Sequence, residues 1–201
     1  MDHIKLEKLN LLTAGPFQAF LYDCDGTLAD NMQAHKDSFV QTASEFGFAL
    51  DPALIDELAG LPTAAVVAEI SKRYQVALDA TLFSNRKGNI FFDEYIAHTQ
   101  PVPFVVEHLK QHAGQVKIGV VSGGRRATVE HTLALLGIDH LIETIVCAGE
   151  TEQGKPFPDP FLKAAQDLGV APERCMVFED GEAGVQSAIA AGMQYIRIDK
   201  I

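Results

Sequence analysis

The sequence of 201 residues predicts an α/β fold in which a parallel sheet is interrupted by an inserted helical domain. The first observation is a set of short apolar runs, rich in β-branched and aromatic residues, which are typical of strands buried on both faces. The second is that helical patterns separate these runs, as in parallel sheets built with right-handed crossovers. The third is a long stretch of helical spacing, without a convincing strand, after the first apolar run.

Five apolar runs are expected to form the strands of the sheet. The first precedes the long helical stretch and the other four follow it. Their near-continuous hydrophobicity indicates a sheet that is covered by helices on both faces. The runs are Phe17 to Asp23, Val116 to Ser122, Thr144 to Gly149, Cys175 to Asp180 and Tyr195 to Asp199.

Glycine marks the expected ends of the later helices, because it adopts the left-handed conformation that commonly closes a helix. Three helical patterns stop at Gly137, Gly169 and Gly192. The second of them is expected to use Asp159 as its N-cap and Pro160 as its first helical residue. Each of these helices would then connect one strand to the next.

The helical stretch between the first and second strands is long enough to form a domain of its own. Residues 30–102 are therefore expected to form a helical cap, and residues 1–29 and 103–201 to form the α/β core. The sequence QPVPF, from Gln100 to Phe104, breaks the helical pattern before the core resumes.

The composition is that of an ordinary globular protein, and the formal net charge of −11 argues against nucleic acid or an anionic membrane as the main partner. The N-terminus lacks the apolar block of a signal peptide, and no segment has the roughly 20 apolar residues of a membrane span. Cys24, Cys147 and Cys175 lack metal-type spacing, so buried free thiols in a reducing compartment are expected. The sequence thus favours a cytoplasmic protein, and no apolar stripe argues against a monomer.

Polar residues stand where the expected strands end. The carboxyl ends of parallel strands share one edge of the sheet, and ligands bind there in open parallel sheets. The first strand leads into paired acids and a Gly-Thr pair, the second into a Ser-Gly-Gly turn, the third into a lysine and the fourth into two further acids. These residues are Asp23, Asp25, Gly26, Thr27, Ser122, Gly123, Gly124, Lys155, Glu179 and Asp180.

This set of residue types suits the hydrolysis of a phosphate monoester. Clustered carboxylates provide the hard oxygen ligands that Mg²⁺ prefers, and the cation offsets the repulsion between a carboxylate and a phosphate dianion. Lys155 would add a positive charge at the transferring phosphoryl group, while Ser122 and amides at a helix N-terminus would bind its oxygens. One acid of the first pair can attack phosphorus, and the other can transfer the proton.

Together these residues resemble the haloacid dehalogenase superfamily, whose signature is Asp-x-Asp-Gly-Thr, then Ser or Thr, then Lys, then paired acids. The match extends over essentially the whole chain. The resemblance implies a Rossmann-like core with a helical cap inserted after the first motif. It also implies Mg²⁺ as the cofactor and an aspartyl-phosphate intermediate.

The resemblance further implies roles for the matched residues. Asp23 is the expected nucleophile and a Mg²⁺ ligand, and Asp25 is the expected general acid/base, with its backbone carbonyl on the metal. Asp180 is expected to bind the metal, and Glu179 to support it directly or through water. Lys155 is expected to contribute to catalysis as well as to phosphate binding. The contacts to phosphate or substrate are expected from Ser122, Gly123, Gly124, Lys155, Gly26, Thr27, His35 and Arg125.

Within the superfamily, the chain is similar to the beta-phosphoglucomutase and sugar-phosphate phosphatase group, in which a histidine matched by His35 contacts the acid/base aspartate. Mutases of this group bind the distal phosphate of their substrate with an arginine in a cap loop. Here that loop contains Gly60 and then Thr63 where the arginine would stand. The second anion site is therefore depleted, which favours hydrolysis. Three further cationic residues have no assigned role: Arg126, Arg86 and Lys87.

The leading hypothesis is a Mg²⁺-dependent phosphatase that acts on small phosphorylated metabolites, most plausibly sugar phosphates. A phosphomutase is the first alternative, and a non-catalytic binding protein that retains the fold is the second. Clustered acids that nothing neutralises are costly, which argues against the second alternative. A response-regulator receiver domain also gathers acids and a lysine, but it leaves the helical insert unexplained.

Overall fold

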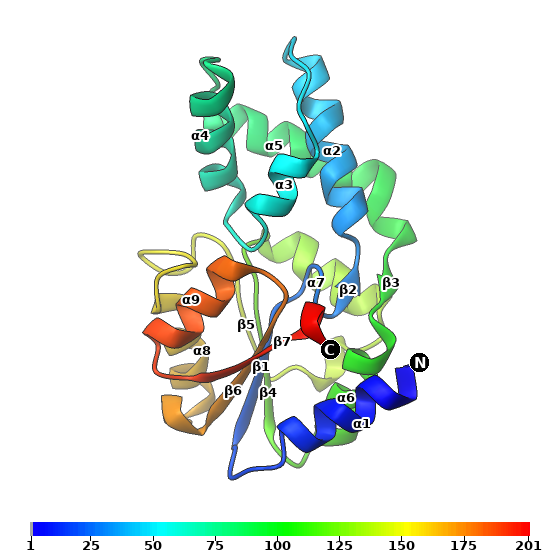
Figure 1. Cartoon of the computed structure of the whole chain (residues 1–201), viewed down its shortest axis with the longest axis vertical. Helices are drawn as coiled ribbons and strands as arrows, with labels where there is room; N and C mark the ends of the chain where they lie inside the picture. The colour runs from blue at the N-terminus through cyan, green and yellow to red at the C-terminus, as the bar shows by residue number, and fades with distance from the viewer. Residues whose placement is uncertain (1) are drawn as a thin grey trace.

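The computed structural model describes residues 2–201, and a five-stranded parallel sheet forms the centre of its lower lobe (Figure 1). Met1, which belongs to the expected core, lies outside the described residues. All five expected strands are present, each slightly shorter than its apolar run. They are β1 (Ala19–Tyr22), β4 (Lys117–Val121), β5 (Thr144–Val146), β6 (Cys175–Glu179) and β7 (Gln194–Arg197).

Strand β1 lies at the centre of the sheet, whose order is β5-β4-β1-β6-β7. Leu21 of β1 is paired with Gly119 of β4 on one side and with Val177 of β6 on the other. The chain first builds one half of the sheet through β4 and β5, and then passes β1 to build the other half. Such a reversal leaves a crevice at the carboxyl ends of the central strands. The expected α/β fold class is therefore confirmed.

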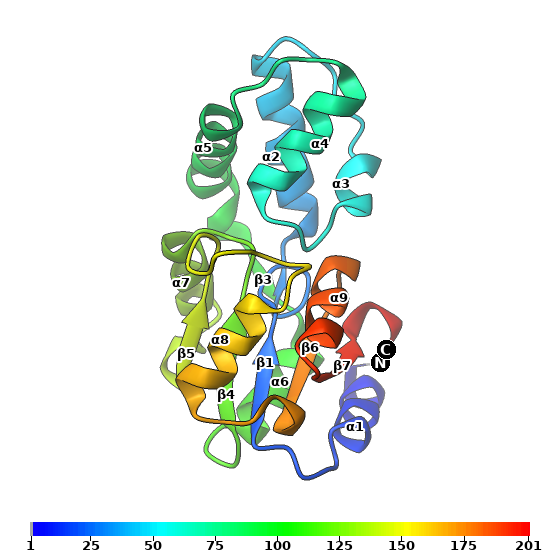
Figure 2. The ribbon, with the colours of Figure 1, turned by 90° about the vertical axis from the view of Figure 1, so that its left-hand side faces the viewer.

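Helices cover both faces of the sheet, as the apolar strands require (Figure 2). Three helices pack on one face, and two pack on the other. The first three are α1 (Asp2–Leu12), α6 (Pro103–His112) and α7 (Arg126–Leu135). The other two are α8 (Asp159–Leu168) and α9 (Glu182–Ala190).

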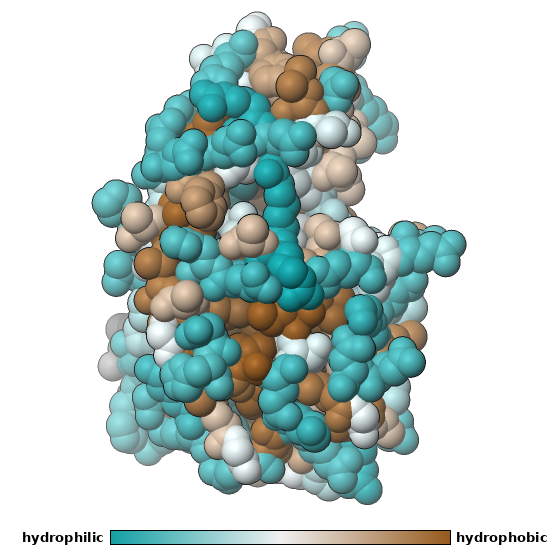
Figure 3. All heavy atoms as spheres, turned by 180° about the vertical axis from the view of Figure 1, so that it is seen from behind, coloured by the Kyte–Doolittle hydropathy of each residue, from teal (hydrophilic) through white to brown (hydrophobic). Residues whose placement is uncertain are grey.

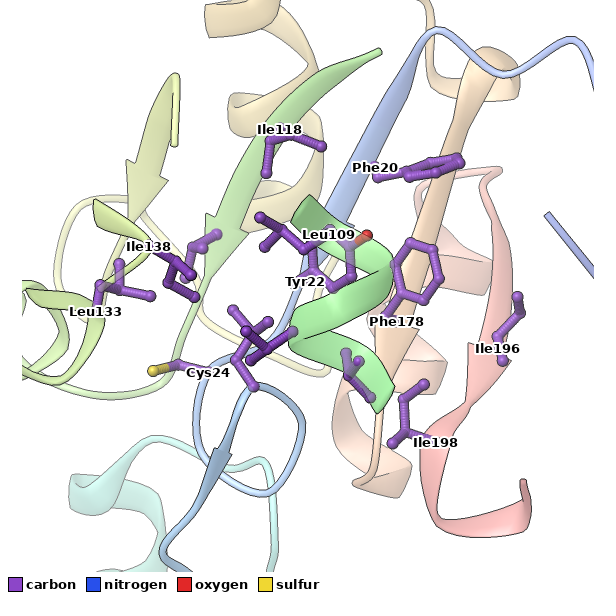
Figure 4. Packing of buried hydrophobic residues seen from close by; sticks show 14 of the residues in the cluster. Phe20, Tyr22, Cys24, Leu109, Ile118, Leu133, Ile138, Phe178, Ile196 and Ile198 are labelled. Atoms are coloured by element: carbon purple, nitrogen blue, oxygen red, sulfur yellow. The ribbon is translucent and has the colours of Figure 1, made fainter. Parts of the chain in front are cut away.

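Aromatic side chains from neighbouring strands gather in the core beside α6 (Figure 4), and one buried histidine, His108, lies among them. The rings of Tyr22 and Phe178 stack with their centroids 4.3 Å apart, and Phe20 meets Phe178 edge-on. His108 is fully buried beside them. Its Nδ1 lies 2.9 Å from the Tyr22 hydroxyl and its Nε2 lies 3.0 Å from Thr13 Oγ1. Both ring nitrogens therefore have partners, as a buried polar group needs.

The upper lobe consists of the helices inserted between β1 and β4 (Figure 1). They pack around a separate apolar core that includes Phe39, Ile55 and Phe83. The helices are α2 (Met32–Glu45), α3 (Ala53–Glu57), α4 (Thr63–Tyr74) and α5 (Ala80–Ile90), which continues as a π-helical turn (Phe91–Tyr95) and a 3₁₀ turn (Ile96–His98).

Two short strands join the lobes, although the sequence predicts no strand in this region. β2 (Ala29–Asp30) pairs antiparallel with β3 (Gln100–Pro101). Strands of two residues carry no periodic pattern, and this pair forms only because the linkers entering and leaving the upper lobe lie side by side. The long helical stretch is therefore bounded by a short strand pair that its sequence pattern does not show.

The helix ends agree with the sequence at their C-termini and differ at one N-terminus. Gly137, Gly169 and Gly192 all have positive φ, which confirms the three expected stops. Asp159 is the first residue of α8 and Pro158 is its N-cap, with no capping side-chain hydrogen bond. Asp159 therefore adds a negative charge to the first turn, where the helix dipole favours it, and does not act as the cap.

Helix α1 is not expected from the sequence, because its apolar pattern is weak: of its residues, Leu9 alone is buried. It nevertheless packs against α6, near the C-terminus (Figures 1 and 2). The three cysteines are buried and free, as expected. No helix within residues 2–201 is both long enough and apolar enough to cross a bilayer.

His108 should make the stability of the fold sensitive to acid. Burial and the neighbouring His112 lower the pKa of His108 from 6.5 to about 3. Between these values the unfolded chain takes up a proton that the folded chain excludes, so stability is complete above pH 6.5 and falls as the pH drops. Between pH 6.5 and pH 4, wild type should lose about 3 kcal/mol of unfolding free energy more than His108→Gln. Urea unfolding across this pH range measures the difference, and parallel profiles would contradict the assignment.

Candidate active site

Asp23 and Asp25 lie in the loop that follows the central strand. Asp23 is the first residue after β1, and its amide donates to the carbonyl of Phe178 in β6. The loop then turns at Gly26, whose φ is +87° and whose amide donates to the carbonyl of Ala29. A Cβ on Gly26 would clash with the carboxylate of Asp180. Glycine is therefore required at this position for both the turn and the close approach of Asp180.

Lys155 joins the C-terminal ends of three strands of the sheet, because Val121 and Glu179 are the last residues of β4 and β6 and Asp23 directly follows β1. Its ammonium donates to Asp23 Oδ1 (2.7 Å), to Glu179 Oε1 (2.5 Å) and to the carbonyl of Val121 (2.8 Å). These acceptors use all three N–H groups of a lysine side chain that is only 4% exposed. Burial alone would lower the pKa of Lys155, but attraction to Asp23 and Glu179 raises it. Lys155 is therefore held as a cation between two carboxylates.

Three acids beside Lys155 form a possible cation site. Asp23, Glu179 and Asp180 each offer one oxygen, and these oxygens lie within 4.8 Å of one another. Burial, and then repulsion from Asp23, raise the pKa of Asp180 to about 7. Burial likewise raises the pKa of Glu179, against the attraction of Lys155. A bound divalent cation would stabilise the ionised form of these carboxylates, and their hard oxygens are the ligands that such a cation prefers.

Asp25 faces the upper lobe and stands apart from this cluster. The side-chain amide of Asn31 donates to Asp25 Oδ1 over 2.7 Å, and His35 Nε2 lies 3.2 Å from the same oxygen. Burial would raise the pKa of Asp25, but the attraction of His35 and the hydrogen bond from Asn31 lower it to about 2. Two residues of the inserted segment therefore determine the ionisation of this core carboxylate. Asn31 is buried and was not predicted from the sequence.

Lys87 is the second site residue without a predicted role. It is 4% exposed, and its Nζ lies 2.6 Å from His35 Nδ1 and about 5 Å from the ring centres of Phe39 and Phe91. Burial lowers the pKa of Lys87 to about 7, although Asp25 attracts its charge. A partly discharged lysine thus reaches Asp25 through the imidazole of His35, whose ring stacks on Phe91.

A signal for Lys87 is present in the sequence. Phe83, Lys87 and Ile90 are the buried residues of α5, and their spacing of four and three places them on one helical face. A lysine within an apolar stripe is rarely buried without a partner. That rule singles out Lys87 and separates it from Arg86, which lies on the exposed face and pairs with Glu45.

Ser122, Gly123 and Gly124 form a turn between β4 and α7. Ser122 is buried, and its Oγ accepts a hydrogen bond from the amide of Gly124 over 3.0 Å. The turn leads directly into α7, a ten-residue helix whose first amides lack partners within the helix. This arrangement is suited to binding an anion.

A cavity of about 90 Å³ lies between the two lobes and above these loops. Its floor contains Asp23, Asp25, Ser122, Gly123 and Gly124, so with His35 of the roof six of the predicted site residues share one space. Its roof comes from the inserted helices and is mostly apolar. The roof residues are Met32, His35, Phe39, Ile55, Leu58, Ala59, Gly60, Leu61, Thr63, Val66 and Lys87.

The loop around Gly60 in the upper lobe contacts the core at two glycines, Gly123 and Gly181. A Cβ on Gly181, which follows Asp180, would come within 2.8 Å of the Ala59 carbonyl oxygen. A Cβ on Gly123 would meet the Leu61 carbonyl oxygen at 3.4 Å. Both core loops therefore leave room for the backbone of the upper lobe to close over the cavity.

The remaining predicted site residues lie elsewhere. Thr27 Oγ1 donates to Asp180 Oδ1 over 3.4 Å, on the side of the acid cluster. Arg125 does not line the cavity; its guanidinium donates to the Ser84 carbonyl of α5 over 2.5 Å, because α5 lies within its reach. Arg126 points away from the site to Glu150 and Glu130. Within residues 2–201, no arginine therefore contributes to the wall of the cavity.

Comparison with known proteins agrees with this geometry. Residues 20–198 match the model of the haloacid dehalogenase-like hydrolase family. The chain is 31% identical over 182 residues to fructose-1-phosphate phosphatase YqaB of Escherichia coli, covering 90% of this chain and 96% of that protein. It is 30% identical over 195 residues to hexitol phosphatase A of the same organism, covering 90% and 83% respectively.

Solved structures give the same result for the fold. Beta-phosphoglucomutase from Clostridium difficile superimposes with a TM-score of 0.79 at 25% identity, covering 90% of this chain and 84% of that one. CbbY from Rhodobacter sphaeroides in complex with phosphate gives a TM-score of 0.80 at 22% identity, with coverages of 90% and 85%. With the acid pair, the lysine and the inserted helices in place, the chain belongs to the haloacid dehalogenase-like hydrolase family.

Proposed function

We propose that this protein is a Mg²⁺-dependent phosphatase of small phosphorylated metabolites, and specifically of sugar phosphates. One observation carries the proposal: Asp23 lines the floor of a cavity together with Ser122, and it is also bound by Lys155 and belongs to the three-acid cluster. The names of its relatives, a fructose-1-phosphate phosphatase and a hexitol phosphatase, support the substrate class.

Asp23 is the proposed nucleophile. Lys155 holds Asp23 Oδ1, which leaves Oδ2 to attack phosphorus. The new bond joins Oδ2 to phosphorus, and the bond between phosphorus and the sugar oxygen breaks. Water then attacks the aspartyl phosphate and releases inorganic phosphate, which restores the carboxylate. Ser122, the amides of Gly123 and Gly124, and the charge of Lys155 stabilise the phosphoryl oxygens throughout.

Asp25 is the proposed acid and base. It gives a proton to the departing sugar oxygen and later takes one from the attacking water. In this structure Asp25 is a carboxylate, with a pKa near 2, and is ready for the second task. The first task needs a protonated Asp25, and a bound phosphate dianion favours protonation because like charges raise the pKa of a carboxyl group.

The cation site is proposed to hold Mg²⁺ with the side chains of Asp23, Glu179 and Asp180 and with the backbone carbonyl of Asp25. The donors fit, because all are hard oxygens and the three side-chain oxygens already lie close together. When bound, Mg²⁺ would neutralise charge on the phosphate and on the acids around it.

Residues 30–102 are proposed to act as a cap that excludes bulk water and selects the substrate. The roof of the cavity offers mainly apolar side chains, with Thr63 where a mutase would carry its arginine. A substrate with one phosphate and a compact neutral alcohol fits this surface better than a bisphosphate. The expected monomeric state and cytoplasmic location stay predictions.

Replacing the nucleophile should abolish turnover. Asp23→Asn removes the attacking oxygen anion, so phosphate release should fall at least 10³-fold, while circular dichroism shows an unchanged fold. Asp30→Asn, an exposed aspartate in β2, is the matched control and should keep wild-type activity. If Asp23→Asn retained turnover, Asp23 could not be the nucleophile.

The product distinguishes the phosphatase from the mutase alternative. Wild type should release inorganic phosphate from fructose 1-phosphate and from hexitol phosphates with Mg²⁺ present. Hexose 1-phosphate should not be converted to hexose 6-phosphate, with or without hexose bisphosphate, because the cavity lacks an arginine for the distal phosphate. Bisphosphate-stimulated isomerisation, followed by chromatography, would favour the mutase. Equal rates on sugar phosphates, nucleotides and phosphoglycolate would remove the support for a sugar substrate.

Mg²⁺ should stabilise the folded protein through the acid cluster. At about 100 times its dissociation constant, a cation that binds only the folded state adds about 2.7 kcal/mol, or a Tm rise of roughly 5–10 °C for a chain of this size. Asp180→Asn should lose most of this rise. Without cation this variant should be at least as stable as wild type, because one source of repulsion is gone. A Tm rise of equal size in both proteins would place the cation elsewhere.

A further inference from the structure

Gly88 lies within α5, close to the π-helical turn that continues the helix, and glycine is unfavourable inside a helix. A Cβ at this position would clash with the guanidinium of Arg125, which projects from the core. The space that a side chain at residue 88 would fill is therefore occupied by Arg125, a residue of the other lobe. Hydrophilic side chains also cross the junction between the lobes on the face opposite that of Figure 1 (Figure 3).

The missing side chain also exposes a hydrogen-bond acceptor. In an α-helix each Cβ is tilted towards the N-terminus, so a side chain at residue 88 would cover the turn that contains Ser84. With glycine there, the Ser84 carbonyl stays open, and Arg125 Nη2 donates to it over 2.5 Å. A carbonyl oxygen has a second lone pair for such a bond even within a helix.

Among the described residues of its own lobe, Arg125 has no comparable partner. It is the N-cap residue of α7, where the helix dipole disfavours positive charge, and its side chain extends to α5 instead. Its neighbour Arg126 has the same charge but pairs with Glu150 and Glu130 of the core. The two adjacent arginines thus have different tasks.

We propose that Arg125 is a positioning residue that holds the cap closed by binding α5 at Ser84, with Gly88 as the required gap. The gap at Gly88 lies one residue from Lys87, which reaches His35 and through it Asp25. Closing the cap therefore also brings the Lys87–His35 pair to the acid/base. The catalytic consequence of this inference rests on the proposed phosphatase activity. The closed arrangement of the cap does not depend on that activity.

Gly88→Ala is the decisive variant, because alanine favours the helix and fills the gap. The melting temperature should not fall, while kcat/KM for the phosphate monoester should drop about tenfold, as expected when one charged hydrogen bond is lost. Arg125→Ala should show the same loss. The double variant should lose no more than either single one, since both changes break one contact. Arg126→Ala removes an equal charge from the adjacent residue and should leave kcat/KM unchanged.

Small-angle scattering gives a readout that does not need activity. Gly88→Ala and Arg125→Ala should both have a larger radius of gyration than wild type, and Arg126→Ala should not. If both radii equal that of wild type, Arg125 does not hold the cap. If Arg125→Ala loses activity while Gly88→Ala keeps it, Arg125 contacts the substrate directly and the proposal is wrong. If wild type released no phosphate, only the proposed function would be overturned. The scattering data would still show whether Arg125 holds the cap closed.

Discussion

The buried contact of Lys155 with Asp23 and Glu179 is the interaction on which the rest of the site depends. Two carboxylates about 4 Å apart repel by about 4 kcal/mol at an effective dielectric constant of 20. The sheet nevertheless brings Asp23, Glu179 and Asp180 to one edge, where the first two are buried. One ammonium between these two acids makes the arrangement tolerable, and its third hydrogen bond fixes it to β4. The C-terminal ends of β1, β4 and β6 are thereby held together.

A second group of charges belongs to the other lobe. Asn31, His35 and Lys87 surround Asp25, although Asp25 itself lies in a core loop. Asp25 therefore has its low pKa only while the inserted helices lie over the sheet. The proposed nucleophile, Asp23, and the proposed acid/base, Asp25, are thus controlled by different parts of the chain: the first by the core, and the second by a segment connected through two linkers.

The sequence predicts the core and most of the site floor for a clear physical reason. Buried parallel strands are recognisable in the sequence as apolar runs, and the polar residues at their C-terminal ends must meet at one edge of the sheet. Asp23, Ser122 and Lys155 could therefore be placed together without coordinates. What it does not predict depends on packing between segments far apart in the chain. The burial of Lys87 needs α5 to lie against α2, and the β2–β3 pair needs the two linkers to be adjacent.

Arg125 illustrates the same limit. Its position beside the Ser-Gly-Gly turn suggests a contact with phosphate, whereas its side chain reaches a carbonyl of α5. The choice between these partners depends on the gap at Gly88, which is recognisable only once the two helices are seen together.

The backbone contact at Gly181 constrains how such an enzyme can change. Even a methyl group there would push against the Ala59 carbonyl, whatever side chains the neighbouring loop carries. New substrate preferences are therefore expected to arise by exchanging roof side chains such as Thr63 and Leu58. The core loop that meets the roof must keep glycine at position 181. Directed evolution for altered selectivity has most freedom on the helical side of the cavity and least on the edge of the sheet.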